Sequence, residues 1–180
     1  MEANKSENLK TRKEFSANSD TLYHAWTDPE QLKKWWKPMG SQLTEIVNEL
    51  QVGGKILYQF TADNMEILVI KGEYLEVIPQ EKLVYTWNWQ VQNEAINDSE
   101  YKLSVYFKKL SNGSSIEVLQ ENDKDQESIH PHQHGWEDAL NHLADYLKLH
   151  NEHSHAEGAA STSSDHDGKP DYGSQNPANV

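Results

Sequence analysis

The segment His130-Pro131-His132-Gln133-His134 holds the residue type that most readily binds a transition metal. A helix would stack His130 and His134 on one face with Glu127 a turn earlier, and an extended chain would put all three imidazoles on one side. No HExxH motif is present, however, and the proline and the position at a helix start favour histidines that are solvated or cap the helix. We therefore predict no metal and no cofactor, with His130, His132 and His134 as the only candidate ligands.

Aromatic side chains are the most informative group, because six tryptophans and eight tyrosines exceed what a small core usually needs. Two interpretations remain open. The rings line a cavity of ~300–1,000 Å³ for an apolar or aromatic small molecule, held by a few Tyr O–H and Trp N–H groups. Alternatively, the same rings fill the interior and leave no pocket.

The adjacent pair Trp35-Trp36 has two interpretations of its own. Neighbouring helical residues point roughly 100° apart, so one ring can pack inward while the other lies at the surface. The pair then forms a lid or a contact patch for a protein partner. Alternatively, both rings seal the helix against the sheet edge.

Catalytic patterns are missing from the sequence. It has no nucleophile elbow, phosphate loop or dinucleotide fingerprint, and Gly53-Gly54 indicates only a turn. The acid–base candidates are His24, Tyr58 and Tyr85, and a lone histidine in a helix is more often a surface or satisfied residue. We therefore predict that the protein is not an enzyme.

These residues must be positioned by elements that the patterns predict in a definite order. Residues 9–15 form a short charged strand. Asn18 or Ser19 then caps a helix over 20–26, and Asp28-Pro29-Glu30 supplies a cap, an N1 proline and a first-turn acid for a second helix ending near Trp36.

After residue 40 the hydrophobic period becomes two, which indicates half-buried antiparallel strands separated by turn residues. Counting the first, we expect seven strands. The last helix carries a broad apolar stripe. The shared strand faces and the stripe comprise Ile56, Tyr58 and Phe60; Leu83, Tyr85, Trp87, Trp89 and Val91; Tyr101, Leu103, Val105 and Phe107; and Trp136, Leu140, Leu143 and Leu147. A curved sheet around one long helix is the α+β arrangement that buries these faces.

Composition limits the domains and partners. The net charge of −13 disfavours nucleic acid and anionic membrane surfaces as partners. Cysteine is absent and no apolar run is long enough for a leader or a membrane span, so we expect a cytoplasmic protein. Residues 151–180 lack Ile, Leu, Met, Phe and Trp. We predict a flexible N-terminus over 1–8, one domain over 9–150 and a disordered acidic tail over 151–180.

Several motifs within that domain resemble the SRPBCC (START-like, helix-grip) superfamily, in the branch of heat-shock-protein-90 ATPase activator homologues. They are residues 25–36 (AWTDPEQLKKWW), 52–55 (VGGK), 72–79 (GEYLEVIP), 81–87 (EKLVYTW) and 134–136 (HGW). The resemblance implies a seven-stranded antiparallel sheet wrapped around the C-terminal helix, with a hydrophobic cavity between them. It also favours His134 as a side chain that fixes the helix start.

Three functions follow from the resemblance and the residues together. The first is binding of a hydrophobic or aromatic small molecule between the sheet and the last helix. We expect its lining to be Tyr58, Phe60, Tyr85, Trp87, Trp89, Leu103, Trp136, Leu140 and Leu143. The second is a cochaperone-like domain acting on a heat-shock ATPase or another stress partner. The third is a cyclase- or hydrolase-type enzyme using His24, Tyr58 or Tyr85.

Overall fold

The order of elements is strand, two short helices, six strands and a long helix, in a computed structural model that describes residues 8–91, 101–122 and 129–160. The chain divides into the units Met1–Lys148 and Leu149–Val180, and the fold below is that of the first. The elements are β1 (Leu9–Phe15), α1 (Ser19–Thr27), α2 (Pro29–Trp35), the 3-10 helix η1 (Pro38–Gly40), β2 (Gln42–Asn48), β3 (Lys55–Thr61), β4 (Ile67–Ile78), β5 (Lys82–Val91), β6 (Tyr101–Leu110), β7 (Gly113–Asn122) and α3 (Ile129–Ala160).

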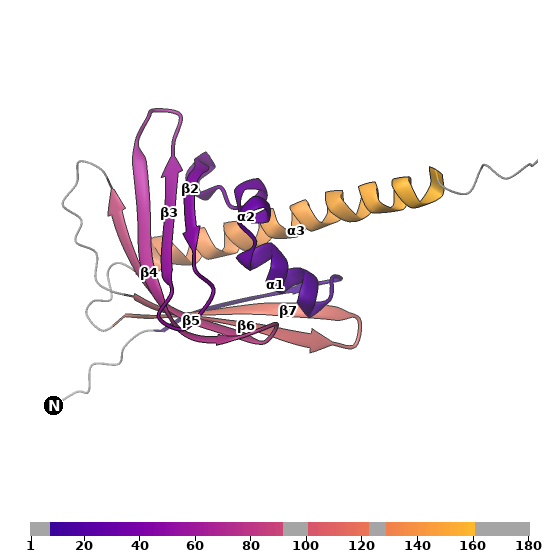
Figure 1. Ribbon diagram of the computed structural model, residues 1–180, viewed down its shortest axis with the longest axis horizontal. Helices are drawn as coiled ribbons and strands as arrows, with labels where there is room; N and C mark the ends of the chain where they lie inside the picture. The colour runs from indigo at the N-terminus through magenta and orange to yellow at the C-terminus, as the bar shows by residue number, and fades with distance from the viewer. Residues whose placement is uncertain (1–7, 92–100, 123–128, 161–180) are drawn as a thin grey trace, which may run out of the picture. The chain divides into compact units, whose positions relative to one another are not determined.

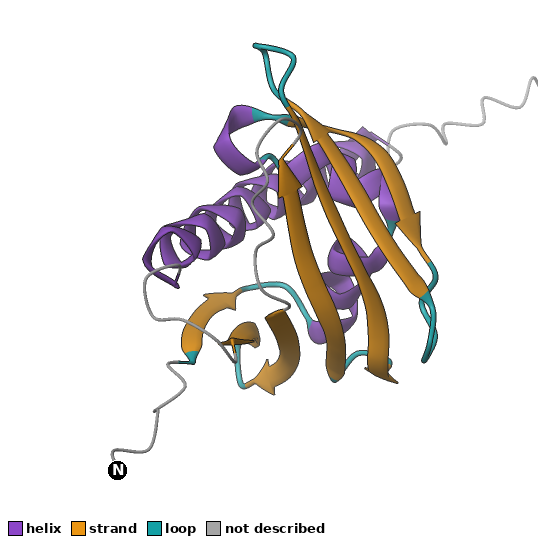
Figure 2. Cartoon of the chain, turned by 90° about the vertical axis from the view of Figure 1, so that its left-hand side faces the viewer, coloured by secondary structure: helices purple, strands orange, loops and turns teal. Residues whose placement is uncertain are grey.

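The seven strands form one antiparallel sheet in the order β1-β7-β6-β5-β4-β3-β2, which confirms the predicted fold class. The sheet bends along its width. Figure 1 shows β3 and β4 running in a different direction from β6 and β7, and Figure 2 shows the same bend from the side. A register shift between Tyr74 and Glu76, where β4 pairs with β5, introduces a bulge of the kind that turns a strand.

The two short helices begin at the residues that the sequence indicates. The Asn18 side chain accepts a hydrogen bond from the backbone N–H of Thr21 at 2.8 Å, so Asn18 rather than Ser19 is the cap of α1. Asp28 caps α2 by accepting from the N–H of Glu30 at 3.0 Å, and Pro29 occupies the first helical position. These caps fix where the tryptophans of both helices enter the interior.

Helix α3 packs its predicted stripe on the concave face of the sheet, in the angle visible in Figure 1. Two hydrogen bonds attach it to the first and last strands: Lys13 Nζ donates to Asn141 Oδ1 and Trp136 Nε1 donates to Gln120 Oε1, both at 2.9 Å. The helix continues to Ala160, past the domain end expected at residue 150. Residues 1–7 and 161–180 lie outside the described part of the chain, so the predictions of a flexible N-terminus and a disordered tail remain predictions.

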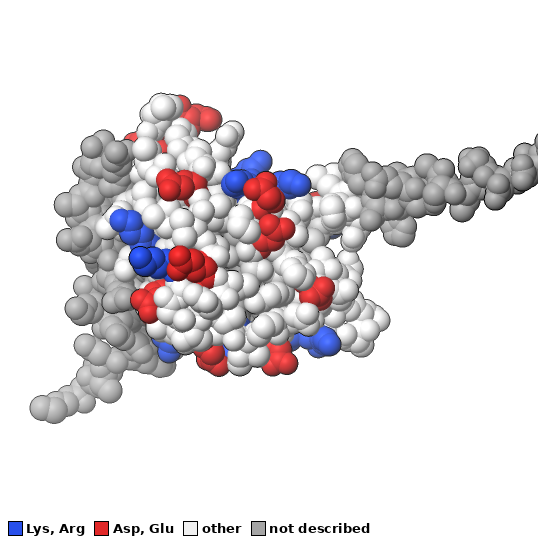
Figure 3. All heavy atoms as spheres, in the orientation of Figure 1, with Lys and Arg blue, Asp and Glu red and all other residues white. Residues whose placement is uncertain are grey.

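Charged side chains lie on the surface. On the face drawn in Figure 3, acidic and basic residues are interspersed. Charged side chains also form ion pairs, such as Lys82–Glu76 at 2.8 Å. None of the side chains that the structure describes as buried carries a formal charge. Within the described residues, no helix is long and apolar enough to cross a membrane.

Candidate functional site

The predicted lining residues meet in the space between the sheet and α3. Eight of the nine are buried: Tyr58 and Phe60 of β3, Tyr85 and Trp87 of β5, Leu103 of β6, and Trp136, Leu140 and Leu143 of α3. Period-two alternation explains the strand residues, and the i, i+4, i+7 spacing explains Trp136, Leu140 and Leu143. Trp89 is only partly buried and packs against the edge of this core. The location is therefore as expected, and the binding role of these residues remains a prediction.

Protein rings occupy the centre of that space. The Trp36 ring stacks on Trp87 with centroids 5.5 Å apart and planes 11° apart. Trp136 lies 5.8 Å from Trp87 and 6.3 Å from Trp36, so the three indoles are in mutual contact. Tyr58 and Phe60 meet the Trp36 ring edge-on at 5.0 and 5.4 Å. Around Trp36, the structure therefore shows the filled interior that was one of the two interpretations.

Trp36 reaches the interior because α2 ends one residue before it. Trp35 is the last helical residue, whereas Trp36 is extended, with φ −88° and ψ 102°. The expected 100° divergence of helical neighbours therefore does not apply, and both rings are buried. Trp35 Nε1 donates to the Ala25 carbonyl at 2.8 Å, which holds α2 against α1. Trp36 is therefore not a surface contact, and its ring packs on the sheet against Tyr58, Phe60 and Trp87.

All six tryptophans are linked by ring contacts. Trp26 of α1 stacks on Trp136 at 6.0 Å and contacts Trp35 at 5.5 Å, while Trp87 contacts Trp89 at 6.1 Å. We refer to these rings, Trp26, Trp35, Trp36, Trp87, Trp89 and Trp136, as the tryptophan cluster. Trp26 and Trp36 were absent from the predicted lining, because the sequence indicates the short helices but not the depth to which their rings extend.

Buried tyrosines supply hydroxyl groups beside the tryptophan cluster. The Tyr58 hydroxyl is hydrogen-bonded to that of Tyr74, which donates to Asn48 Oδ1 at 2.6 Å. Tyr85 accepts a hydrogen bond from Trp26 Nε1 at 3.3 Å. Burial is the main cause that raises the pKa of Tyr58 and of Tyr85 above its usual value of 10.0. Both hydroxyls therefore stay protonated at neutral pH and act as hydrogen-bonding groups rather than as bases.

Four buried polar atoms have no hydrogen-bond partner among the described residues: Trp87 Nε1, Gln120 Nε2, Thr11 Oγ1 and Ser115 Oγ. Gln120 was absent from the predicted lining. The signal was available, because Ile116, Val118 and Gln120 alternate on one face of β7, which puts the amide on the apolar side. Its carbonyl oxygen accepts from Trp136 Nε1, whereas its N–H₂ group has no acceptor.

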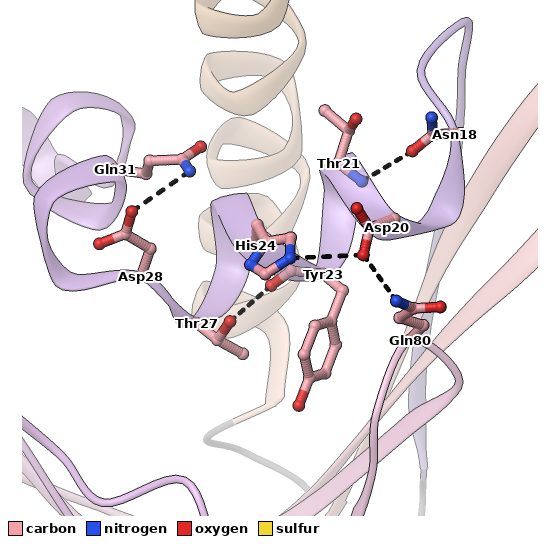
Figure 4. A network of polar contacts seen from close by, with 9 residues as sticks. All are labelled: Asn18, Asp20, Thr21, Tyr23, His24, Thr27, Asp28, Gln31 and Gln80. Atoms are coloured by element: carbon pink, nitrogen blue, oxygen red, sulfur yellow. Dashed lines mark hydrogen bonds and ion pairs between the residues drawn. The ribbon is translucent and has the colours of Figure 1, made fainter.

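His24 does not join this interior. Its side chain is exposed on α1, where Nε2 lies 3.3 Å from Asp20 Oδ1, and Asp20 also accepts from Gln80 Nε2 at 2.6 Å (Figure 4). His24 is therefore at the surface, whereas Tyr58 and Tyr85 are buried, so the three acid–base candidates do not share one site.

The candidate metal ligands His130, His132 and His134 lie in the first turns of α3, but their side chains are outside the described part of the structure. Among the described residues, no group of three potential ligands is close enough to hold a metal ion. The histidine cluster therefore stays untested.

A bent seven-stranded sheet holding a C-terminal helix across a ring-lined interior defines the helix-grip class of proteins. Within it, the family described as Activator of Hsp90 ATPase homolog 1-like protein matches residues 16–148. The chain belongs to this family, which confirms the resemblance seen in the sequence.

Solved structures share the fold of this chain. Protein CV1439 from Chromobacterium violaceum is 26% identical with a TM-score of 0.66, covering 77% of this chain and 96% of its own. The AHSA1 protein from Silicibacter pomeroyi is 20% identical, with a TM-score of 0.71 and coverage of 80% and 99%. Protein NE0264 from Nitrosomonas europaea is 19% identical, with a TM-score of 0.69 and coverage of 83% and 99%. No curated protein matches the chain significantly.

Proposed function

We propose that the chain binds a flat hydrophobic small molecule between the sheet and α3, in the place that the Trp36 ring holds against Trp87. The main support for this proposal is the stacking of Trp36 on Trp87, with ring planes 11° apart. It supports the proposal because a surface that accepts one flat ring in parallel stacking also accepts another of similar size.

The short segment that carries Trp36 supports exchange of that ring. Trp36 follows α2, a helix of seven residues, and precedes η1 of three residues. Such short helices gain little stability from their own hydrogen bonds. A ligand that replaces the indole therefore has to displace a small segment, and the sheet and α3 keep their places.

The test is calorimetric titration of the full chain with 2-ethylnaphthalene, with tryptophan fluorescence recorded in parallel. We expect one molecule to bind per chain and to change the emission of the tryptophan cluster. An absence of both heat and fluorescence change up to the solubility limit would overturn the proposal.

Two variants locate the site. Trp36→Ala removes the competing ring, so we expect tighter binding, although the free energy of unfolding falls by about 3–5 kcal/mol. The control is Tyr106→Ala, which removes a half-buried ring from the opposite face of the sheet and should leave affinity unchanged. Weaker binding in Trp36→Ala, or an equal effect of the control, would contradict the exchange of rings.

A second candidate is interaction with a heat-shock ATPase, favoured by the description of the matched family. Addition of the chain to the Hsp90 of its own source should then raise the ATPase rate in proportion to binding. An unchanged rate together with no complex in a sedimentation experiment would remove this candidate.

We further propose that binding is not followed by a reaction. The supporting observations are the exposed position of His24 and the raised pKa of the buried Tyr58 and Tyr85, which leave no base beside the tryptophan cluster among the described residues. The proposal would be contradicted if the wild-type chain converted a bound probe chemically and the Tyr58→Phe or Tyr85→Phe variant did not.

A further inference from the structure

We infer that the preferred ligand of this site is a flat organic cation, such as an N-methylated aromatic ring, held by the faces of the surrounding aromatic side chains. The inference rests on the proposed function and adds the charge of the ligand to its shape. Its starting point is the set of rings around the place that the Trp36 indole occupies.

Four rings lie close to the centre of the Trp36 indole. Their centroids are 5.0 Å away for Tyr58, 5.4 Å for Phe60, 5.5 Å for Trp87 and 5.9 Å for Trp35. A positive charge is attracted to the face of an aromatic ring within about 6 Å of its centroid. A cation centred where the Trp36 ring now lies would therefore be within that distance of all four rings.

Two of these rings offer a face rather than an edge. Trp87 and Trp35 both stack on Trp36, with planes 11° and 14° from its own. The face of an aromatic ring carries the negative part of its quadrupole, whereas the edge is positive. A flat cation lying parallel to Trp87 therefore meets the attractive side of an indole, and tryptophan is the side chain that attracts cations most strongly.

Other contacts hold these two rings independently of Trp36. The Trp87 ring also contacts Trp136 of α3 at 5.8 Å. The Trp35 N–H donates to the Ala25 carbonyl at 2.8 Å, which fixes that ring against α1. Exchange of the Trp36 ring for a ligand would thus leave both faces in place.

The charges of the protein favour a cation over an anion. None of the side chains described as buried is a lysine, arginine or histidine, so no positive group repels a cation there. The net charge of −13 attracts cations to the molecule and repels anions. Aspartate and glutamate are likewise absent from the described buried side chains, so the local attraction would come from the ring faces.

The interior also selects the kind of cation. A primary ammonium has three N–H donors, and each costs free energy if it is buried without an acceptor. The hydroxyls of Tyr58 and Tyr74 are already bonded to each other, and Tyr74 also donates to Asn48. A methylated ring nitrogen has no N–H group, so it needs no acceptor when it leaves water. The structure therefore favours aromatic cations without N–H groups.

The experiment compares two probes of the same shape, N-methylquinolinium and 1-methylnaphthalene, of which only the first is charged. Calorimetry with the full chain should give the cation a Kd at least ~10-fold lower, a factor that corresponds to about 1.4 kcal/mol. The same factor should be reached in about 0.5 M sodium chloride, where surface charges are screened beyond roughly 4 Å. A smaller factor in either buffer would overturn the inference while the proposed function stands. Failure of both probes to bind would overturn both.

Fluorinated tryptophan tests whether the ring faces cause the preference. Fluorine withdraws electron density from the face of the indole and changes its size little, so it weakens the attraction of a cation without removing the ring. In the full chain labelled with fluorotryptophan, the preference for N-methylquinolinium over 1-methylnaphthalene should fall. An unchanged preference would show that the ring faces do not bind the charge.

A pair of variants assigns the preference to one ring. In Trp87→Leu, which keeps an apolar side chain, the preference for the cation should fall below ~3-fold. The matched control is Trp26→Leu, because the Trp26 ring stacks on Trp136 and contacts Trp35 instead, and its preference should stay at the wild-type value. A folded Trp87→Leu that stays above ~3-fold would refute the role of this ring. The fluorinated chain decides the matter if a variant fails to fold.

Discussion

At the scale of the residue, the buried hydroxyls of Tyr58, Tyr74 and Tyr85 make the interior sensitive to alkali. Burial is the first cause of the raised pKa of each group. A tyrosine whose pKa is higher in the folded state contributes stability that is complete below its unfolded value of 10.0 and is lost as pH rises through its folded pKa. The free energy of unfolding should therefore be level with respect to these groups at neutral pH and fall above pH 10.

Tyr85→Phe tests this directly. Each such tyrosine contributes up to about 1.4 kcal/mol per pH unit to the decline, so the slope above pH 10 should be smaller in the variant by that amount. Urea unfolding between pH 8 and 12 measures it. Phe107→Leu is the control, because it perturbs the same core without removing an ionisable group. An unchanged slope in Tyr85→Phe would show that its hydroxyl ionises freely in the folded state.

Single residues also show where sequence analysis of the site reached its limit. Periodicity gave the faces that carry the strand and α3 members of the lining, and the family resemblance implied that these faces meet. The position of Trp36 could not be predicted, because the direction of its side chain depends on α2 ending at Trp35. Helix propensities do not locate the end of a helix to within one residue. Gln120 lies on a strand face that alternation does predict, but only the fold shows that its amide donor lacks a partner.

At the scale of the element, the strands could be predicted because the period of two and the turn residues agree along the whole sheet. Curvature of the sheet was also expected, but the position of the bend could not be predicted, since the register shift between Tyr74 and Glu76 has no distinct sequence signal. Gly72 precedes that shift on β4. A Cβ atom at Gly72 would collide with the backbone carbonyl of Thr86 on β5. The close approach of the two strands therefore requires glycine there.

A pair of glycine substitutions tests this element. Gly72→Ala should lower the free energy of unfolding by about 1–3 kcal/mol, because the strands must separate to admit the methyl group. Gly135→Ala on α3 should instead raise it by about 0.5–1 kcal/mol, since no atom lies within 4 Å of the new Cβ and alanine favours the helix. Chemical denaturation measures both. A tolerated Gly72→Ala would mean that β4 and β5 are not in close contact at this position.

At the scale of the whole molecule, Leu147 is the last α3 residue that the structure describes as buried, and it lies close to the division between the two units at Lys148. Deletion of residues 151–180 should therefore leave the melting temperature within about 2 °C of the full chain, because the removed residues include no Ile, Leu, Met, Phe or Trp. Calorimetric scans of both chains provide the comparison. A large loss of melting temperature would show that these residues stabilise the fold.

The central claim is that a flat molecule enters between the sheet and α3, and the indole N–H signals of the six tryptophans report on it most directly. Proton–nitrogen NMR spectra of the full chain should be recorded during titration with 2-ethylnaphthalene. We expect the Trp36, Trp87 and Trp136 signals to shift with a single saturation curve. Saturation of the protein with all three signals unchanged would contradict the account.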